Sequence, residues 1–230
     1  MAGPGARLRF PIMAVDTGLT PPPAPALFTD RYELTMVAAA LADGTADRQC
    51  VFEVFTRRLP HGRRYGVLAG TGRLLEALPY FRFGDDEVAA LREQGLTNAR
   101  LLDRLADFRF SGDIDGYAEG ELYFPGSPVL TVRAPFAEGV LLETLALSVL
   151  NHDSAIASAA ERMTSAAYGR PIIEMGSRRT HEEASVAAAR AIALSWLSTD
   201  RTRVSSTTHS ANPPRMLSTG EPGKNSSPSA

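Results

Sequence analysis

The sequence predicts an α/β protein, with an α+β N-terminal domain followed by the opening of a parallel α/β domain. Short β-rich runs punctuated by glycine and proline alternate with helical stretches through the first 133 residues. A long helical stretch follows, and after it come a β-branched run, a turn and a helix start. Strand, loop and helix in that order are typical of a βα unit.

The N-terminal domain begins with a helix and a strand. Thr29 or Asp30 can cap a helix that carries Tyr32 and ends at Gly44. Residues 49–56 are rich in valine and phenylalanine and predict a strand.

Residues 70–107 are expected to be helical, with interruptions at Pro79, Gly84 and Gly95 and a cap at Asp85. Residues 114–132 then predict short strands separated by glycine and proline.

A long helix is predicted over about residues 139–168. Its first half is rich in leucine, whereas residues 154–160 are almost all alanine and serine. Such small side chains let another helix or a sheet approach closely. His152, next to Asp153, is interpreted as structural.

The segment 172–183 points to a binding site. Ile172 and Ile173 predict a buried strand, Gly176 and Ser177 a turn, and Thr180 with Glu183 a capping box that starts a helix running to about Trp196. Arg178 and Arg179 would then lie beside a helix N-terminus, where free N–H groups and guanidinium donors favour a phosphate or carboxylate. In the alternative interpretation, one arginine pairs with a nearby glutamate and braces the loop.

Composition limits the class of protein. The chain has 230 residues, a formal net charge of −2 and one cysteine, Cys50. This net charge gives no electrostatic attraction of the whole protein to nucleic acid. The basic cluster 57–64 either faces a phosphate or forms a solvated loop. One cysteine excludes an internal disulfide and thiolate zinc clusters. No apolar run reaches the ~18 residues of a membrane helix, and we expect a cytoplasmic protein.

Four segments together resemble nicotinate phosphoribosyltransferases, in the order and approximate spacing of that family. They are Leu27–Met36 (LFTDRYELTM), Val51–Pro60 (VFEVFTRRLP), Glu119–Pro128 (EGELYFPGSP) and Glu174–Glu182 (EMGSRRTHE). The resemblance implies an N-terminal α/β domain packed on an irregular α/β barrel. It also implies a homodimer, with the active site between one subunit's N-terminal domain and the other subunit's barrel.

The resemblance further implies the reaction and the residues that serve it. The family joins nicotinate to phosphoribosyl pyrophosphate, giving nicotinate mononucleotide and pyrophosphate, with magnesium and with ATP hydrolysis through a phosphorylated histidine. Tyr32 matches the tyrosine that stacks on the pyridine ring, and Arg178 the arginine that holds anionic groups, with Arg179 beside it. Ser177 and His181 are further candidates, although His181 does not match the phosphorylated histidine.

The chain departs from the family after about Ile192. The sequence carries no Gly-Thr-x-x-His motif, and a tail rich in Ser, Thr, Pro and Asn follows. We therefore expect a truncated enzyme that is weakly active or inactive. The expected regions are a disordered lead-in (1–25), the N-terminal domain (26–133), the first part of the barrel (134–197) and a disordered tail (198–230). The alternatives are a nicotinamide or quinolinate phosphoribosyltransferase and a non-catalytic fragment that binds a full-length homologue.

Overall fold

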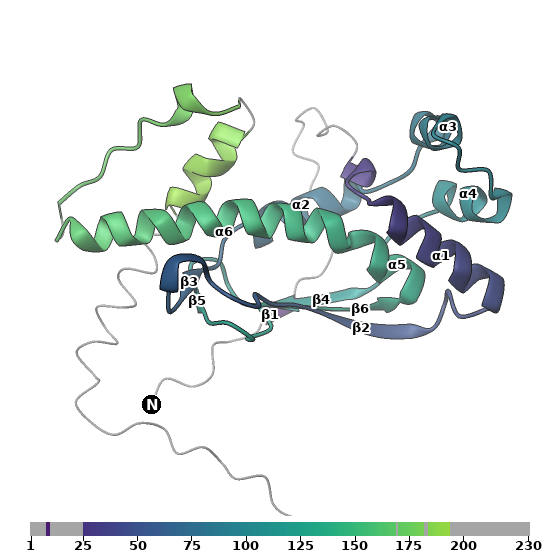
Figure 1. Cartoon of the computed structure of the whole chain (residues 1–230), viewed down its shortest axis with the longest axis horizontal. Helices are drawn as coiled ribbons and strands as arrows, with labels where there is room; N and C mark the ends of the chain where they lie inside the picture. Colours follow the sequence, from purple (N-terminus) through teal and green to yellow (C-terminus); the bar gives the residue numbers. More distant parts are fainter. Residues whose placement is uncertain (1–7, 10–24, 169, 182–183, 194–230) are drawn as a thin grey trace, which may run out of the picture.

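A four-stranded antiparallel sheet forms one layer of the protein and helices cover one of its faces (Figure 1). The computed structural model describes residues 8–9, 25–168, 170–181 and 184–193. The strand order is β1-β4-β6-β2. These strands are β1 (Leu8–Arg9), β2 (Gln49–Val54), β4 (Asp113–Gly116) and β6 (Leu130–Pro135).

The longest pairing joins the edge strand β2 to β6, with Val54 opposite Leu130 and Phe52 opposite Val132. Side chains along β2 alternate between exposed and half-buried, the period of two that a strand with one covered face requires. The prediction of a β-rich run over residues 49–56 is confirmed. Strand β1 falls within the predicted disordered lead-in; the rest of that lead-in up to residue 24, and all of the tail 198–230, lie outside the described residues.

Helix α1 (Arg31–Asp43) begins and ends as the sequence predicts. Asp30 is the N-cap and Glu33 completes a capping box, since its carboxylate accepts the Asp30 N–H at 3.0 Å. Gly44 ends the helix in the left-handed conformation, with φ of 79°.

Residues 71–106 contain three helices, α2 (Thr71–Ala77), α3 (Asp85–Glu93) and α4 (Ala99–Ala106). The breaks fall at the predicted proline and glycines, but Gly84 rather than Asp85 is the N-cap of α3. Phe81, Phe83 and Phe108 pack edge to face among them, with ring centroids 5.6–5.9 Å apart. The remaining short elements are η1 (Pro25–Leu27), η2 (Pro60–Gly62), η3 (Leu78–Tyr80), α5 (Phe136–Gly139) and η4 (Val140–Leu142).

The long helix α6 (Glu143–Ala166) crosses the molecule above the sheet (Figure 1). Its small-residue half packs against a two-stranded antiparallel sheet of β3 (Gly66–Val67) and β5 (Leu122–Tyr123). The Ser158 hydroxyl accepts the Val67 N–H at 2.8 Å, and the Ser154 hydroxyl bonds both the N–H and the carbonyl of Ala69. The prediction of close approach at residues 154–160 is therefore confirmed.

The predicted strand at Ile172 and Ile173 is wrong. Residues 171–176 have no regular secondary structure, and Ile173 is 81% exposed. A β-branched run becomes a strand only when another strand takes up its N–H and C=O groups, and no strand of the described residues lies beside it. The turn follows as η5 (Ser177–Arg179), and residues 184–193 are helical. Glu183, the second half of the predicted capping box, lies outside the described residues.

None of the described helices is long and apolar enough to cross a membrane.

Candidate functional site

Tyr32 lies in the first turn of α1 and presents part of its ring to solvent. The residue is 46% exposed, and Phe28 and Met36 on either side in sequence are 51% and 40% exposed. Desolvation of the hydroxyl raises the pKa of Tyr32, and its hydrogen bond to Glu143 and the nearby carboxylates of Glu33 and Asp30 raise it further. The hydroxyl therefore stays protonated at neutral pH, while part of the ring remains open to a flat ligand.

A buried carboxylate fastens this end of α1 to the start of α6. Glu33 is fully buried, and one of its oxygens accepts the Thr144 N–H at 3.1 Å and the Thr144 hydroxyl at 2.8 Å. Its other oxygen accepts the Asp30 N–H. Burial raises the pKa of Glu33, although these three hydrogen bonds act in the opposite direction.

The arginine segment lies elsewhere in the chain. Arg178 and Arg179 occupy η5 and are exposed, and the Arg179 N–H bonds the Gly176 carbonyl at 2.8 Å. His181 is exposed as well, whereas the side chain of Ser177 lies outside what the structure describes. Both guanidinium groups are thus accessible to an anion. The predicted contribution of a helix N-terminus stays a prediction.

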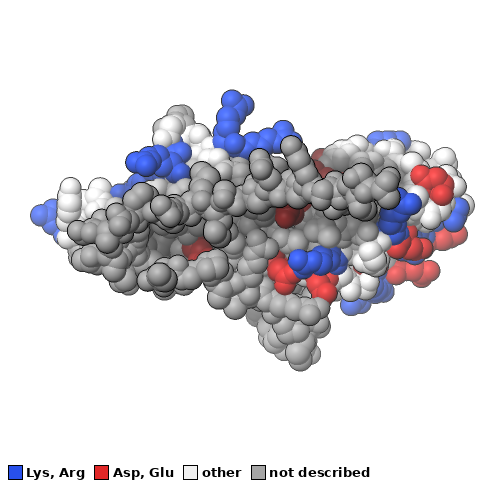
Figure 2. Space-filling model, turned by 90° about the horizontal axis from the view of Figure 1, so that it is seen from below, with Lys and Arg blue, Asp and Glu red and all other residues white. Residues whose placement is uncertain are grey.

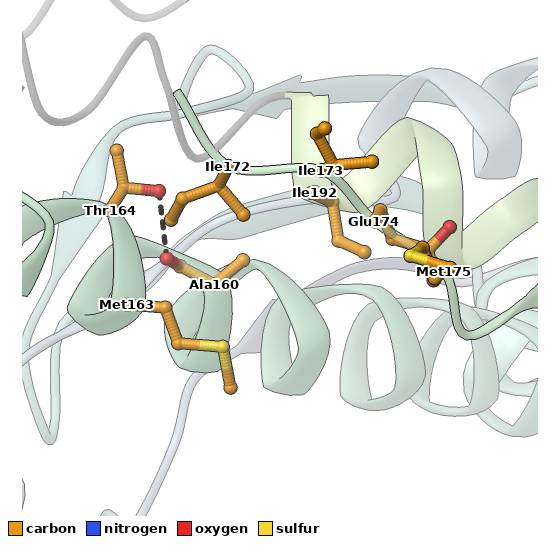
Figure 3. Close-up of a pocket in the computed structure, with 8 residues that line it drawn as sticks. All are labelled: Ala160, Met163, Thr164, Ile172, Ile173, Glu174, Met175 and Ile192. Atoms are coloured by element: carbon orange, nitrogen blue, oxygen red, sulfur yellow. Dashed lines mark hydrogen bonds between the residues drawn. The ribbon is translucent and has the colours of Figure 1, made fainter. Parts of the chain in front are cut away.

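A pocket of about 300 Å³ lies beside this segment, but it is not the predicted anion site (Figure 3). Figure 3 shows side chains from the second half of α6 on one side and from residues 172–175 on the other. Its lining is mainly apolar and includes neither arginine. The lining residues are Ala160, Met163, Thr164, Ile172, Ile173, Glu174, Met175 and Ile192.

The structure does not bring Tyr32 and Arg178 together within one chain. Glu33, the neighbour of Tyr32 in α1, bonds Thr144 at the start of α6, whereas residues 172–175 line a pocket with Ala160 and Thr164 toward the other end of that helix. Figure 1 shows α1 and the segment 170–181 well separated along the long axis of the molecule.

Between these two ends, a polar cluster joins α6 to α2. The Asp153 carboxylate accepts two hydrogen bonds from Arg73 and one contact from His152 Nδ1 at 2.7 Å. The Glu119 carboxylate accepts the N–H groups of Gly70 and Gly72. His152 is therefore held in a structural network, as expected. Sequence reasoning missed Arg73 and Glu119, because their partners lie 80 and 47–49 residues away.

The basic loop that precedes β3 remains open to both of its interpretations. Arg57, Arg58 and Arg64 are exposed, and the guanidinium of Arg162 lies 5.3 Å from the centre of the Tyr65 ring. Seen from below in Figure 2, basic and acidic side chains are interspersed over the visible described part. Within the described ranges, no three His, Cys, Asp or Glu side chains come together as metal ligands.

Comparison with known proteins identifies the class. The fold is similar to that of human nicotinic acid phosphoribosyltransferase, with a TM-score of 0.67 and 30% identity, over 73% of this chain and 34% of the human one. The profile of the nicotinate phosphoribosyltransferase (NAPRTase) N-terminal domain matches residues 27–151, more than half of the chain. The chain belongs to the nicotinate phosphoribosyltransferase family.

Two bacterial members of the family are similar in sequence to this chain over about two thirds of its length or more. The chain is 72% identical over 165 residues to nicotinate phosphoribosyltransferase pncB1 of Mycobacterium tuberculosis, covering 72% of this chain and 36% of the relative. It is 33% identical over 156 residues to the Bacillus subtilis enzyme, covering 68% and 32%. The chain therefore spans about a third of the length of the curated relatives it matches. The resemblance stated from four sequence segments is confirmed.

Proposed function

We propose that this chain contributes to a nicotinate phosphoribosyltransferase of NAD salvage, which joins nicotinate and phosphoribosyl pyrophosphate to give nicotinate mononucleotide and pyrophosphate. The observation that carries the proposal is the 72% identity to the Mycobacterium tuberculosis enzyme over 165 residues. The open ring of Tyr32 at the start of α1 supports it, because an aromatic face gives a flat heterocycle apolar contact at low entropic cost.

In this proposal, Tyr32 stacks on the pyridine ring, while Arg178 and Arg179 hold anionic groups of the substrates. The exposure of all three side chains is consistent with these roles. Their separation along α6 supports a homodimer in which one subunit supplies the tyrosine and the other the arginines. Holding both substrates in place would account for much of the rate acceleration.

Magnesium and ATP belong to the proposal by family resemblance. Mg²⁺ is usually held by substrate phosphates and one or two carboxylates, rather than by a full cage of protein ligands. The described residues contain no such cage. A cytoplasmic location is also part of the proposal.

We expect little or no activity from the 230-residue chain by itself. The four recognised segments contain no candidate for the phosphorylated histidine, and the matched part corresponds to about a third of the relatives. The test incubates the purified chain with labelled nicotinate, phosphoribosyl pyrophosphate, Mg²⁺ and ATP, and measures labelled nicotinate mononucleotide. Robust formation of the product would overturn the expectation of inactivity. Replacing nicotinate by nicotinamide or quinolinate tests the related transferases.

One observation favours a second candidate function, a non-catalytic chain that binds a full-length homologue. Large apolar side chains are exposed around the second half of α6 and the segment after it. They are Met163, Tyr168, Ile173, Met175 and Val186, between 63% and 90% exposed. Contiguous exposed apolar surface is typical of a protein interface.

Co-purification decides between the two functions. The tagged chain is expressed with a tagged full-length relative, and the experiment is repeated with Met163→Asp and Met175→Asp. Retention that these substitutions abolish supports binding through this face. A stable monomer that never retains the relative argues against it.

A further inference from the structure

The apolar pocket between α6 and residues 172–175 belongs to the exposed face that the second candidate function uses. Ile192 lines this pocket and lies one position before the end of the helical residues 184–193. Figure 3 shows Ile192 among the side chains that surround the pocket. We propose that residues 194–197, Leu-Ser-Trp-Leu, cover the pocket with Trp196 as their anchor, so that the chain closes its own apolar face. This inference is independent of the proposed transferase and bears on the second candidate function.

The lining of the pocket suits a large aromatic side chain. Met163, Ile173 and Met175 contribute to it and are 63%, 81% and 66% exposed. Covering apolar side chains that lie together is favourable, because it removes their surface from water. Methionine side chains adapt to an aromatic ring and make favourable sulfur–aromatic contacts. A tryptophan buries about 150–250 Å², so Trp196 could cover much of this surface.

The geometry of the chain keeps Trp196 within reach of the pocket. Residues 194–197 lie outside the described residues and continue directly from them. Trp196 follows the lining residue Ile192 by four positions, and four residues span at most about 14 Å when fully extended. Residues four apart lie on the same side of a helix, so one further helical turn would also bring Trp196 to the side of Ile192. An extended path and a helical path therefore both allow the indole to lie over the pocket.

Composition and tethering favour this segment over other occupants. Residues 194–197 bring a tryptophan and two leucines together, whereas the large apolar side chains of residues 198–230 are Val204, Met216 and Leu217. A segment tethered by a few residues has an effective concentration on the order of millimolar. A separate protein at a much lower concentration competes poorly with it. Residues 194–197 would therefore be an autoinhibitory contact, and a homologue would bind this face only after they have left it.

The first experiment measures whether the indole of Trp196 is shielded from water. The chain has a single tryptophan, so tryptophan fluorescence reports on this segment alone. The emission maximum and the quenching by acrylamide are measured for the 230-residue chain in native buffer and in urea. We expect emission at shorter wavelength and weaker quenching in native buffer, because a covered indole is removed from water and from the quencher. Equal values in the two conditions overturn the proposal.

Substitutions in the pocket then show where the indole lies. Met163→Asp and Ile173→Asp each place a charge at an exposed lining position, so each should shift the emission toward that of the unfolded chain. Phe124→Asp is the matched control, because Phe124 is 51% exposed and does not line the pocket. Far-ultraviolet circular dichroism checks that all three variants keep their helices. A shielded indole whose emission neither pocket substitution changes lies elsewhere, which overturns the proposal.

Dilution distinguishes the chain's own segment from a second copy. The emission maximum of a contact within one chain does not depend on protein concentration, whereas a shift to longer wavelength on dilution would show a contact between copies and overturn the proposal. Trp196→Ser should increase the retention of the full-length relative in the co-purification assay, and unchanged retention overturns the autoinhibitory role. Retention by neither chain refutes the second candidate function, and the fluorescence measurements then decide the proposal alone.

Discussion

The carboxylate of Asp153 accepts hydrogen bonds from both Nε and Nη2 of Arg73, at 3.0 and 2.8 Å. This two-point contact fastens α6 to α2 in the middle of the molecule. The Asp153 side chain is only 5% exposed, whereas Arg73 is 35% exposed. The carboxylate of the pair is therefore shielded from solvent, whereas the guanidinium is partly exposed.

Asp153→Asn should lower the free energy of unfolding by roughly 1–3 kcal/mol, because the charged hydrogen bonds to Arg73 lose their carboxylate partner. Asp47→Asn is the matched control, since Asp47 pairs with Arg104 at 2.6 Å but is 75% exposed. Surface ion pairs of that kind contribute about 0–1 kcal/mol to the free energy of unfolding. Urea denaturation measures the free energy of unfolding of both variants. Equal losses in the two variants would show that the Asp153–Arg73 pair contributes no more to stability than the exposed pair.

Gly70→Ala should be more destabilising than Gly95→Ala. Both glycines have positive φ, 99° and 86°, so alanine strains the backbone at each. At Gly70, however, an added Cβ would also lie 3.1 Å from atoms of Asp153 and Val149, whereas at Gly95 it meets nothing within 4 Å. The difference between the melting temperatures of the two variants measures the contribution of packing at Gly70. A Gly95→Ala variant with the larger loss would show that this packing is looser than described.

The buried Glu33 should make stability depend on pH. Its pKa is raised by burial, so between the ordinary value of 4.5 and the raised value the folded chain holds more of this proton than the unfolded chain. Its contribution to stability therefore falls as pH rises through that window. Relative to wild type, Glu33→Gln should gain stability as the pH is raised from 4.5 to 7.

Denaturation curves at several pH values measure this trend. Ser148→Ala, at an exposed position of α6 without a titratable side chain, should keep a constant difference from wild type over the same range. A parallel pH dependence in wild type and Glu33→Gln would refute the assignment.

Ser158→Ala should cost roughly 1–3 kcal/mol, because it leaves the buried Val67 N–H without its acceptor at 2.8 Å. Ser148→Ala, at an exposed position of the same helix, controls for the change in helix propensity and should be close to neutral. Hydrogen exchange at the Val67 amide gives a local readout. Unchanged protection in Ser158→Ala would show that the hydroxyl is not what holds strand β3 to α6.

Local signals were sufficient to predict most of the N-terminal domain. Asp30, Glu33 and Gly44 set both ends of α1 through short-range hydrogen bonds and a left-handed turn, which can be read from sequence. The strand at Ile172–Ile173 was wrong because β-branched residues indicate only a local preference. The pairing that makes a strand comes from a distant partner, and the described residues supply none there.

The candidate site, too, could be predicted from the sequence only in part. Tyr32 came from motif resemblance, and Arg178 and Arg179 from the pattern of the segment 172–183 together with that resemblance. The structure adds that all three are accessible and that Tyr32 lies far from the two arginines. The link between Glu33 and Thr144 could not be singled out, because it spans 111 positions and depends on how two helix starts pack. Only the tertiary structure places that carboxylate beside the start of α6.

The length of α6 has a consequence for genetics. At 1.5 Å per residue, its 24 residues extend about 36 Å. In the proposed homodimer, each pocket would take its tyrosine from one subunit and its arginines from the other. A cell carrying one allele altered at Tyr32 and a second altered at Arg178 would then assemble one intact pocket in each mixed dimer. The same two alterations on a single allele, beside an unaltered one, would leave both pockets of the mixed dimer defective.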